Sequence, residues 1–553
     1  MTTGPDRTIG LTGGVAKGDR GRSLDFSGRS RPVGLPSAEQ VPPPVTALSG
    51  EFRVAEHFDH QIGKTIGNFG DAEALLVRPE GQAIARQRWG NDGKRIIGAT
   101  AKPRPAQRSA RNMQTKLNVG SASECSCVNG TGDTMTMSRR EAIGIALLFT
   151  GGLAAGTRGS LAMGTDQAMQ LSLADLKRDA GEAWRYFAGT GRGPRRGLVP
   201  AAVWPEGDSY GSYDSLTMWD MGSIILAYVS ALSIGLIEAK EFDERVTTVV
   251  AFMKRSEFRW GKLVLPNYRT SITDGRFVEP GYDATDTGRL LVALHILDKA
   301  TGGAHDASKL VARWDLGGVV VEGAPHDVKS TKRIKSECHN YIYYIARAHR
   351  LWDIEVATGY KAHVNPEDTE ARNAFLAHVA KMGAIASEPS LNEAIELGHS
   401  PQSQILAETL YAAQRERFEE TGLLTCVSEA PIDKKPWFTY QGYNPKAEGW
   451  YRWPVHSVVT DDLWSTKSFA DTYRMVNTKA AYMCLAATGD DYALKLREHI
   501  WSKARSGSRG FAPGVYETTG KCPRITDVNT NAAVLASIAS IIAGHKPLAT
   551  LKV

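Results

Sequence analysis

Cysteine is scarce in this chain, with six residues among 553. They are Cys125, Cys127, Cys338, Cys426, Cys484 and Cys522. No two of them form a C-x-x-C pair, and none has a histidine partner at zinc spacing, so the sequence gives no case for a zinc site. One or two disulfides could form in an oxidising compartment, and unpaired structural thiols fit the sequence equally well.

The main part of the chain also lacks an excess of charge of either sign. The whole chain has a net charge of +6, from 66 Lys+Arg and 60 Asp+Glu. Residues 1–134 hold 18 basic and 13 acidic residues, which leaves 48 basic and 47 acidic residues for the rest. Because the main region is nearly neutral, it offers no electrostatic case for nucleic-acid binding.

Signals of several enzyme classes are weak or missing. The chain has no G-x-x-x-x-G-K loop for phosphates, and no G-x-S-x-G elbow with a matching triad stands out. His399 and His456 are better interpreted as hydrogen-bonded polar residues than as metal ligands. We therefore expect neither a cofactor nor a metal ion.

Residues 1–134 have little sustained apolar periodicity and are rich in Gly, Pro, Arg and Ser. Such a composition predicts a disordered extension, or an upstream stretch that is not part of the natural product. Its basic run at 102–111 (KPRPAQRSAR) is broken by proline. We interpret that run as a solvated charge cluster and not as an RNA-binding or membrane-binding site.

Residues 135–162 have the order of an export signal. Arg139 and Arg140 precede a short, Gly-rich apolar stretch at 143–156, and a small-residue site ending at Ala162 follows. This order is typical of a secretory signal, and the arginine pair is typical of the twin-arginine type. The apolar stretch is short for a membrane span. We expect a periplasmic or secreted protein without stable membrane insertion, with Met135 or Met137 as the natural start.

From about residue 171 onward the pattern is mostly helical. Helices are predicted over 217–236, 241–254, from 285, and over 338–351, 370–384, 401–415, 467–487, 490–504 and 529–543. Long helices that alternate with loops predict packed helical hairpins. For residues 163–553 we expect one domain, an α/α toroid of six hairpins around a central cleft.

The loops between these helices mix aromatic residues with carboxylates. Examples are 277–286 (FVEPGYDATD), 426–443, 448–453 (EGWYRW), 461–467 (DDLWSTK) and 514–517 (GVYE). Aromatic rings cover the apolar faces of sugar rings, and carboxylates bind sugar hydroxyls. Hydrolysis of a glycosidic bond needs two carboxyl groups, one of which must keep its proton. The mixture therefore predicts an oligosaccharide or polysaccharide substrate.

The order of several motifs resembles a bacterial domain-of-unknown-function family (number 3131). The resemblance lies at 217–223 (TMWDMGS), 281–291 (GYDATDTGRLL), 428–433 (SEAPID), 465–467 (STK), 515–520 (VYETTG) and 529–532 (NTNA). That family is similar to α/α-toroid glucan enzymes, including endo-β-1,2-glucanases and the cyclising part of cyclic β-1,2-glucan synthases. The resemblance implies a toroid and a β-glucan substrate.

The resemblance also implies the site residues. Acidic motif positions of the family correspond to Glu279, Asp286, Glu429 and Glu517, which are the catalytic candidates. The candidates for substrate binding are Trp219, Asp220, Tyr282, Asp283, Trp437, Glu448, Trp450 and Asp462. Asp283 departs from the family pattern, where a small polar residue is expected.

The candidate acids divide by their local setting. Glu279 or Glu429 is the favoured general acid, and the less polar neighbours of Glu429 could keep it protonated. Asp286 or Glu517 is the favoured partner, and Asp286 lies at a helix start that favours its ionised form.

We expect an exported glycoside hydrolase or transglycosylase on a β-glucan, with β-1,2-glucan favoured. The alternative is a non-catalytic polysaccharide-binding protein that assists glucan export or assembly. A lyase is disfavoured because acids outnumber Arg and Lys in the loops.

Overall fold

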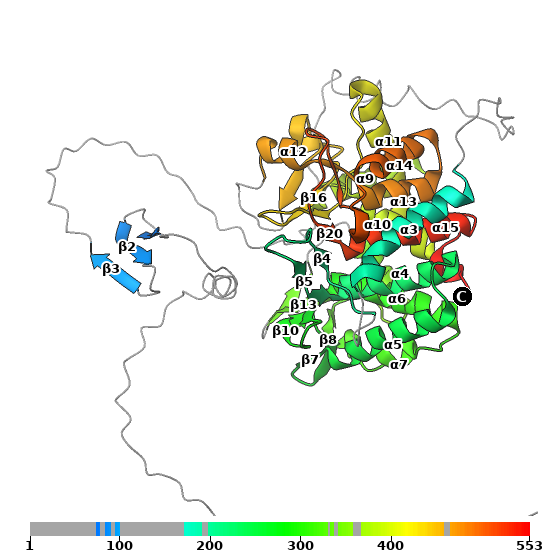
Figure 1. Ribbon diagram of the computed structural model, residues 1–553, viewed down its shortest axis with the longest axis horizontal. Helices are drawn as coiled ribbons and strands as arrows, with labels where there is room; N and C mark the ends of the chain where they lie inside the picture. The colour runs from blue at the N-terminus through cyan, green and yellow to red at the C-terminus, as the bar shows by residue number, and fades with distance from the viewer. Residues whose placement is uncertain are drawn as a thin grey trace, which may run out of the picture. The chain divides into compact units, whose positions relative to one another are not determined.

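The computed structural model describes residues 171–190, 197–329, 332–336, 341–357, 367–457 and 465–553, together with three strands between residues 73 and 99 (Figure 1). The chain divides into two compact units, Met1–Leu153 and Ala154–Val553. The predicted export signal at 135–162 lies outside the described residues. Within the described ranges, no helix has the length and apolarity needed to cross a membrane.

In the first unit, the strands β1 (Glu73–Val77), β2 (Ala83–Trp89) and β3 (Arg95–Ala99) form an antiparallel meander. These strands fall inside the extension that the composition predicts to be disordered. The rest of that extension lies outside the described residues, so its character stays a prediction.

The second unit is mostly helical, as predicted. Its described helices are α3 (Leu173–Thr190), α4 (Met218–Ile234), α5 (Ala239–Arg255), α6 (Ala284–Thr301), α7 (Ala307–Val311), α8 (Ile342–Arg350), α9 (Thr369–Met382), α10 (Ser387–Leu397), α11 (Pro401–Thr421), α12 (Lys467–Tyr473), α13 (Thr478–Thr488), α14 (Asp491–Lys503) and α15 (Val528–Ile542).

Six of these helices contact one another in a closed cycle. Helix α4 packs against α6 and α15, α13 packs against α15 and α10, and α8 contacts both α6 and α10. Helices α4 and α15 are buried along most of their length, which explains why α4 is apolar almost all round. Helices α3, α5, α7, α11 and α14 pack against α15, α4, α6, α10 and α13, respectively.

The crossing of α4 and α6 depends on a glycine. A Cβ atom added at Gly222 would lie 3.0 Å from the backbone oxygen of Arg289, so a larger residue would push the two helices apart. The start of α4 is fixed by a capping box, in which Thr217 accepts from the Asp220 amide and Asp220 accepts from the Thr217 amide. The predicted start at Thr217 is therefore confirmed.

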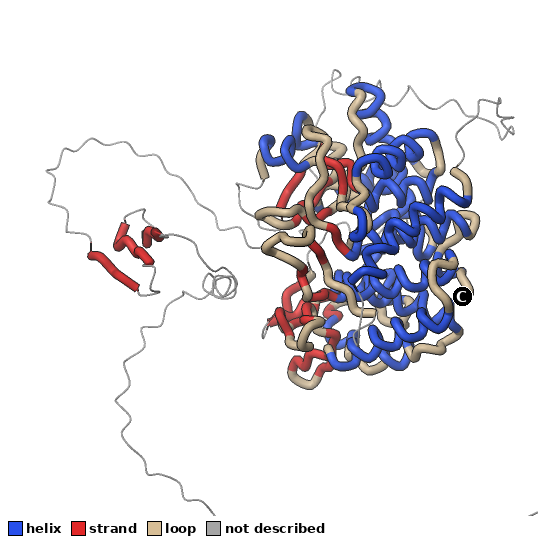
Figure 2. Tube along the Cα trace, viewed as in Figure 1, coloured by secondary structure: helices blue, strands red, loops and turns tan. Residues whose placement is uncertain are grey.

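Short strands gather along one side of the helical body (Figure 2). They are β4 (Ala202–Val203), β5 (Ser212–Tyr213), β6 (Ser215–Thr217), β7 (Glu257–Trp260), β8 (Leu263–Pro266), β9 (Arg269–Ser271), β10 (Phe277–Glu279), β11 (Gly281–Tyr282), β12 (Val320–Val321), β13 (Ala324–Lys329), β14 (Lys332–Lys335), β15 (Ala430–Pro431), β16 (Phe438–Gln441), β17 (Val455–Ser457), β18 (Met475–Asn477), β19 (Gly514–Tyr516) and β20 (Thr526–Asp527).

The short strands form small sheets in the orders β10-β9-β6, β11-β13-β12 with β14 on β13, β15-β16-β17, β18-β19, β20-β4-β5 and β7-β8. Strands β6, β11, β18 and β20 lead directly into α4, α6, α13 and α15. This arrangement places the strands at the N-terminal ends of those buried helices.

The structure divides the single helix predicted over 467–487 into α12, β18 and α13. Strand β18 pairs with β19, with Met475 opposite Tyr516, and the Asn477 side chain then caps α13 by accepting from the Ala480 amide. Pairing between this strand and a distant segment has overridden the local helix propensity.

Helix α10 was not predicted.

A buried ion pair joins three helices of the cycle. The Arg289 guanidinium on α6 pairs with Glu396 on α10, and the Tyr344 hydroxyl on α8 donates to Glu396 Oε2 at 2.7 Å. Both charged side chains are fully enclosed. Because both charges are out of water, removal of either partner would strongly destabilise the folded state.

We expect Glu396→Gln to lower the free energy of unfolding by about 3–5 kcal/mol, because it leaves the buried Arg289 charge uncompensated. The matched control is Glu408→Gln, which breaks a half-exposed pair with Arg372 and is expected to cost at most about 1 kcal/mol. Urea unfolding of the two variants measures the difference. Equal losses would contradict this assignment.

Candidate active site

The N-terminal ends of the buried helices meet at the strand side of the molecule. Between α15 and α4, the Asn529 amide donates to Asp220 Oδ1 at 2.9 Å. Between α4 and α6, the Thr217 side chain lies near enough to Asp286 to lower its pKa against the effect of burial. Polar groups that are far apart in the sequence therefore share one end of the helix cycle.

The same end carries a group of side chains around Glu429. Tyr341 directly precedes α8, and its hydroxyl donates to Glu429 Oε2 at 2.9 Å. Lys479 on α13 forms an ion pair with Glu388 on α10, and its Nζ lies 3.8 Å from Glu429 Oε1. The Asn477 amide donates to the backbone oxygen of Glu429 at 3.0 Å. The carboxyl group of Glu429 thus lies between Tyr341 and Lys479, and its backbone is held by Asn477.

The surroundings of Glu429 raise the pKa of its carboxyl group. Its side chain is 14% exposed. Burial, followed by the negative charge of Glu388, raises the pKa of Glu429 to about 8, against the opposing effect of Lys479. The raised pKa agrees with the direction predicted from its less polar sequence neighbours, but the contribution of Glu388 was not predicted. A carboxylic acid that stays protonated near neutral pH can act as a proton donor.

A second group of carboxyls lies at the starts of α4 and α6. Burial, and then the charges of Asp283 and Asp220, raise the pKa of Asp286 well above its ordinary value, against the effect of Arg269. The pKa of Asp283 is also raised by burial, although its carboxylate caps α6 by accepting from two backbone amides. The helix-start argument predicted the opposite direction for Asp286. Burial and like charges outweigh the helix N-terminus here.

Tyr440 on β16 links the two groups of acids. Burial raises the pKa of Tyr440, and the negative charges of Glu429 and Asp286 raise it further. Both carboxyls therefore act on the same phenol. The Tyr440 residue is 44% exposed, so this part of the site faces solvent. The two groups of acids therefore lie within electrostatic range of one partly exposed phenol.

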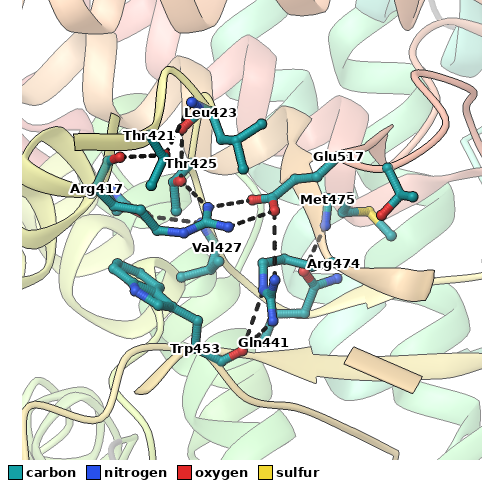
Figure 3. Close-up of polar contacts among 12 residues, drawn as sticks. Arg417, Thr421, Leu423, Thr425, Val427, Gln441, Trp453, Arg474, Met475 and Glu517 are labelled. Carbon is teal, nitrogen blue, oxygen red and sulfur yellow. Dashed lines mark hydrogen bonds and ion pairs between the residues drawn. The ribbon is translucent and has the colours of Figure 1, made fainter. Parts of the chain in front are cut away.

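The other two catalytic candidates are neutralised by arginine. Glu279 on β10 is 47% exposed and pairs with Arg269 at 2.8 Å. The Glu517 carboxylate, which follows β19, accepts from Arg417 at 2.8 and 2.9 Å (Figure 3). Arg474 lies 3.6 Å from the same carboxylate. Each of these two acids therefore has an arginine partner in a charge-assisted contact.

The predicted aromatic contacts fall into two kinds. Tyr282 is 1% exposed and Trp219 is 6% exposed, so both rings pack inside the helical body. Trp437 is half-buried and lies in an aromatic cluster with Trp204 and Tyr210, at ring-centroid distances of 6.5 and 5.2 Å. Of the three, Tyr210 is exposed.

Of the remaining candidates, Trp450 is half-buried and stacks near Tyr451, and Glu448 is exposed. Among the described residues, neither forms a hydrogen bond or ion pair with Glu429 or Asp286. Asp462 lies outside the described residues.

Sequence reasoning missed several residues of the site, namely Glu388, Lys479, Tyr341, Tyr440 and Arg269. One signal was available for Lys479. It is the second residue of α13, two positions after the cap residue Asn477. A cation is disfavoured at a helix N-terminus, so a lysine there suggests a specific acidic partner.

A metal site and a serine-hydrolase elbow are two other possible kinds of active site. In the parts of the chain that the structure describes, no group of three His, Cys, Asp or Glu side chains is arranged to hold a metal ion. Residues 207–211 (GDSYG) fit the letter pattern of a serine-hydrolase elbow, but they lie in the turn between β4 and β5. The elbow needs a turn from a strand into a helix, so this serine is not in that setting.

We expect the stability of Glu429→Gln to depend less on pH than that of the wild type. The folded-state pKa of Glu429, about 8, lies above its unfolded value of about 4.3. Between these values the folded chain holds a proton that the unfolded chain has lost, so wild-type stability falls as the pH rises. The contribution is up to about 1.4 kcal/mol per pH unit. Denaturant unfolding at a series of pH values measures it, and identical slopes would contradict the assignment.

Comparison with known proteins agrees with the sequence motifs. The family described as "protein of unknown function (DUF3131)" matches residues 178–541. No curated protein matches the chain. Among solved structures, a candidate glucoamylase from Bacteroides fragilis NCTC 9343 has a TM-score of 0.51 at 14% identity, covering 69% of this chain and 94% of that chain. An endo-β-1,2-glucanase from Chitinophaga pinensis has a TM-score of 0.48 at 12% identity, covering 68% and 94%. The first likeness shows a shared fold, and the chain belongs to the DUF3131 family.

Proposed function

We propose that the protein is a glycoside hydrolase or transglycosylase that acts on a β-glucan, with Glu429 as general acid and Asp286 as its partner. The observation that carries the proposal is the nearly buried Glu429 carboxyl, which lies beside Glu388 and Lys479 and, like Asp286, acts on Tyr440. The fold shared with a candidate glucoamylase supports a carbohydrate substrate. The family's resemblance to endo-β-1,2-glucanases favours the β-1,2 linkage.

In the proposed reaction, Glu429 protonates the oxygen of the leaving sugar as the glycosidic bond breaks. Asp286 accepts a proton from the attacking water, or from a sugar hydroxyl in a transfer reaction. Burial and the charges of Asp283 and Asp220 raise the pKa of Asp286, which strengthens it as a proton acceptor. Activity is then expected to rise as Asp286 ionises and to fall as Glu429 ionises.

Other candidate residues are proposed to bind the substrate. Asp220 and Asp283 lie beside Asp286 and are proposed to bind sugar hydroxyls. Trp437 is the proposed ring-stacking residue, with Trp204 and Tyr210 extending its surface. The helix cycle and its outer helices are proposed to form the six-hairpin α/α toroid. Export through residues 135–162 stays a prediction.

We expect Glu429→Gln and Asp286→Asn each to lower kcat by at least about a hundredfold, because each removes a proton-transfer group at nearly constant volume. The substrate is the member of a β-glucan panel from which the full chain releases new reducing ends. Glu279→Gln is the comparison variant, and it is expected to keep most of the activity because Glu279 is exposed and paired with Arg269.

The opposite pattern, with Glu279→Gln inactive and Glu429→Gln active, would move the acid to Glu279. A wild type that binds a glucan but turns over none would favour the alternative function, a binding protein that assists glucan export or assembly.

We expect Trp437→Ala to weaken glucan binding by about threefold to tenfold while leaving the Tm nearly unchanged. The reason is that a half-buried ring can stack on sugar without supporting the core. Trp219→Ala is the matched control, and its buried ring should make the loss mainly one of stability. Calorimetric titration with a β-1,2-glucan oligosaccharide, together with thermal unfolding, separates the two effects. A large fall in Tm for Trp437→Ala would place that ring in the core.

A further inference from the structure

The short segment that carries Glu429 is held between two helix starts. The Ser387 hydroxyl, at the start of α10, donates to the backbone oxygen of Val427 at 2.8 Å. The backbone N–H of Asn477, at the start of α13, donates to the backbone oxygen of Cys426 at 2.8 Å. These contacts fix Glu429 next to the first turns of α10 and α13, where Glu388 and Lys479 lie.

The charges in this group do not balance if every side chain is ionised. Glu388 and Lys479 are both buried, and Glu429 is nearly so. Two carboxylates and one ammonium group would leave one negative charge away from water. A proton retained on one carboxyl removes that charge, so the group is most stable with a single ionised carboxylate.

Geometry selects which carboxyl keeps the proton. The ammonium group is in direct contact with Glu388, but it lies 3.8 Å from Glu429, which is beyond hydrogen-bonding distance. Glu388 also lies in the first turn of α10, where the helix N-terminus favours a negative charge. Glu429 lies in no helix.

We infer that Glu388 is a positioning residue for the acid, because it engages the Lys479 ammonium group, which would otherwise pair with Glu429, and so leaves the proton on Glu429. The inference rests on the proposed function for the use of that proton in catalysis. The location of the proton is a property of the protein alone. The other titratable groups that face Glu429 are Tyr341, which donates a hydrogen bond to it, and Tyr440 on β16.

Two variants should move the titration of Glu429 in opposite directions. Glu388→Gln removes the competing charge and frees Lys479 to pair with Glu429, so Glu429 should ionise at a pH lower by about one unit or more. Lys479→Gln removes the only ammonium group recorded beside the two carboxyls in the described chain, so Glu429 should ionise at a higher pH. The matched control is Glu393→Gln, which removes another buried α10 carboxylate, paired with Arg347, and should leave the titration unchanged.

Infrared spectroscopy of the full chain measures the titration without any substrate. The carboxylic acid band that is present in the wild type and missing from Glu429→Gln reports Glu429, and we expect it to titrate at about pH 8 in the wild type. The alkaline limb of the kcat/KM profile on the glucan that is turned over should shift in the same directions. Circular dichroism checks that each variant is folded.

A wild-type band that titrates in the ordinary carboxyl range would overturn the inference. So would a folded Glu388→Gln variant that titrates like the wild type, which is the result expected of a merely structural ion pair. If Glu388→Gln does not fold, the wild-type titration and the Lys479→Gln shift decide. If the titration shifts occur as expected but the protein turns over no glucan, the inference is upheld and the proposed function is contradicted.

Discussion

The crowding of buried carboxyl groups at one end of the helix cycle is the constraint on which the site depends. Asp220, Asp283, Asp286 and Asp527 lie at the starts of α4, α6 and α15, and burial raises the pKa of each. Capping bonds to backbone amides offset part of this cost. The part that is not offset raises the proton affinity of each acid. Carboxyl groups with such shifted pKa values are frequent at active sites.

The helix cycle makes this crowding stable. The enclosed Arg289–Glu396 pair joins α6 to α10, and the Tyr344 hydroxyl adds α8. The Gly222 contact lets α4 approach α6 closely. A rigid frame of this kind keeps like charges near one another, whereas a flexible one would let them separate into water. Stability of the frame and proton affinity at the site are therefore linked.

The sequence predicted what depends on local pattern. The Thr217 cap and the buried character of α4 follow from neighbouring residues. For Glu429 the sequence predicted the direction of the pKa shift, but its causes, burial and Glu388, arise from packing. The site partners could not be predicted in the same way. Glu388 and Lys479 meet only because α10 packs against α13, and Glu517 is neutralised by an arginine 100 residues away. The prediction that the helix start keeps Asp286 ionised was wrong for a related reason. Burial, which depends on the packing of the helices, has the largest effect on its pKa, and the charges of Asp283 and Asp220 add to it.

The most direct test of the account is a crystal structure of Glu429→Gln bound to a β-glucan oligosaccharide. The account predicts a glycosidic oxygen about 2.6–3.2 Å from the side chain of residue 429, with Asp286 near the reacting sugar. An oligosaccharide bound elsewhere on the protein, with no glycosidic oxygen near residue 429, would contradict it.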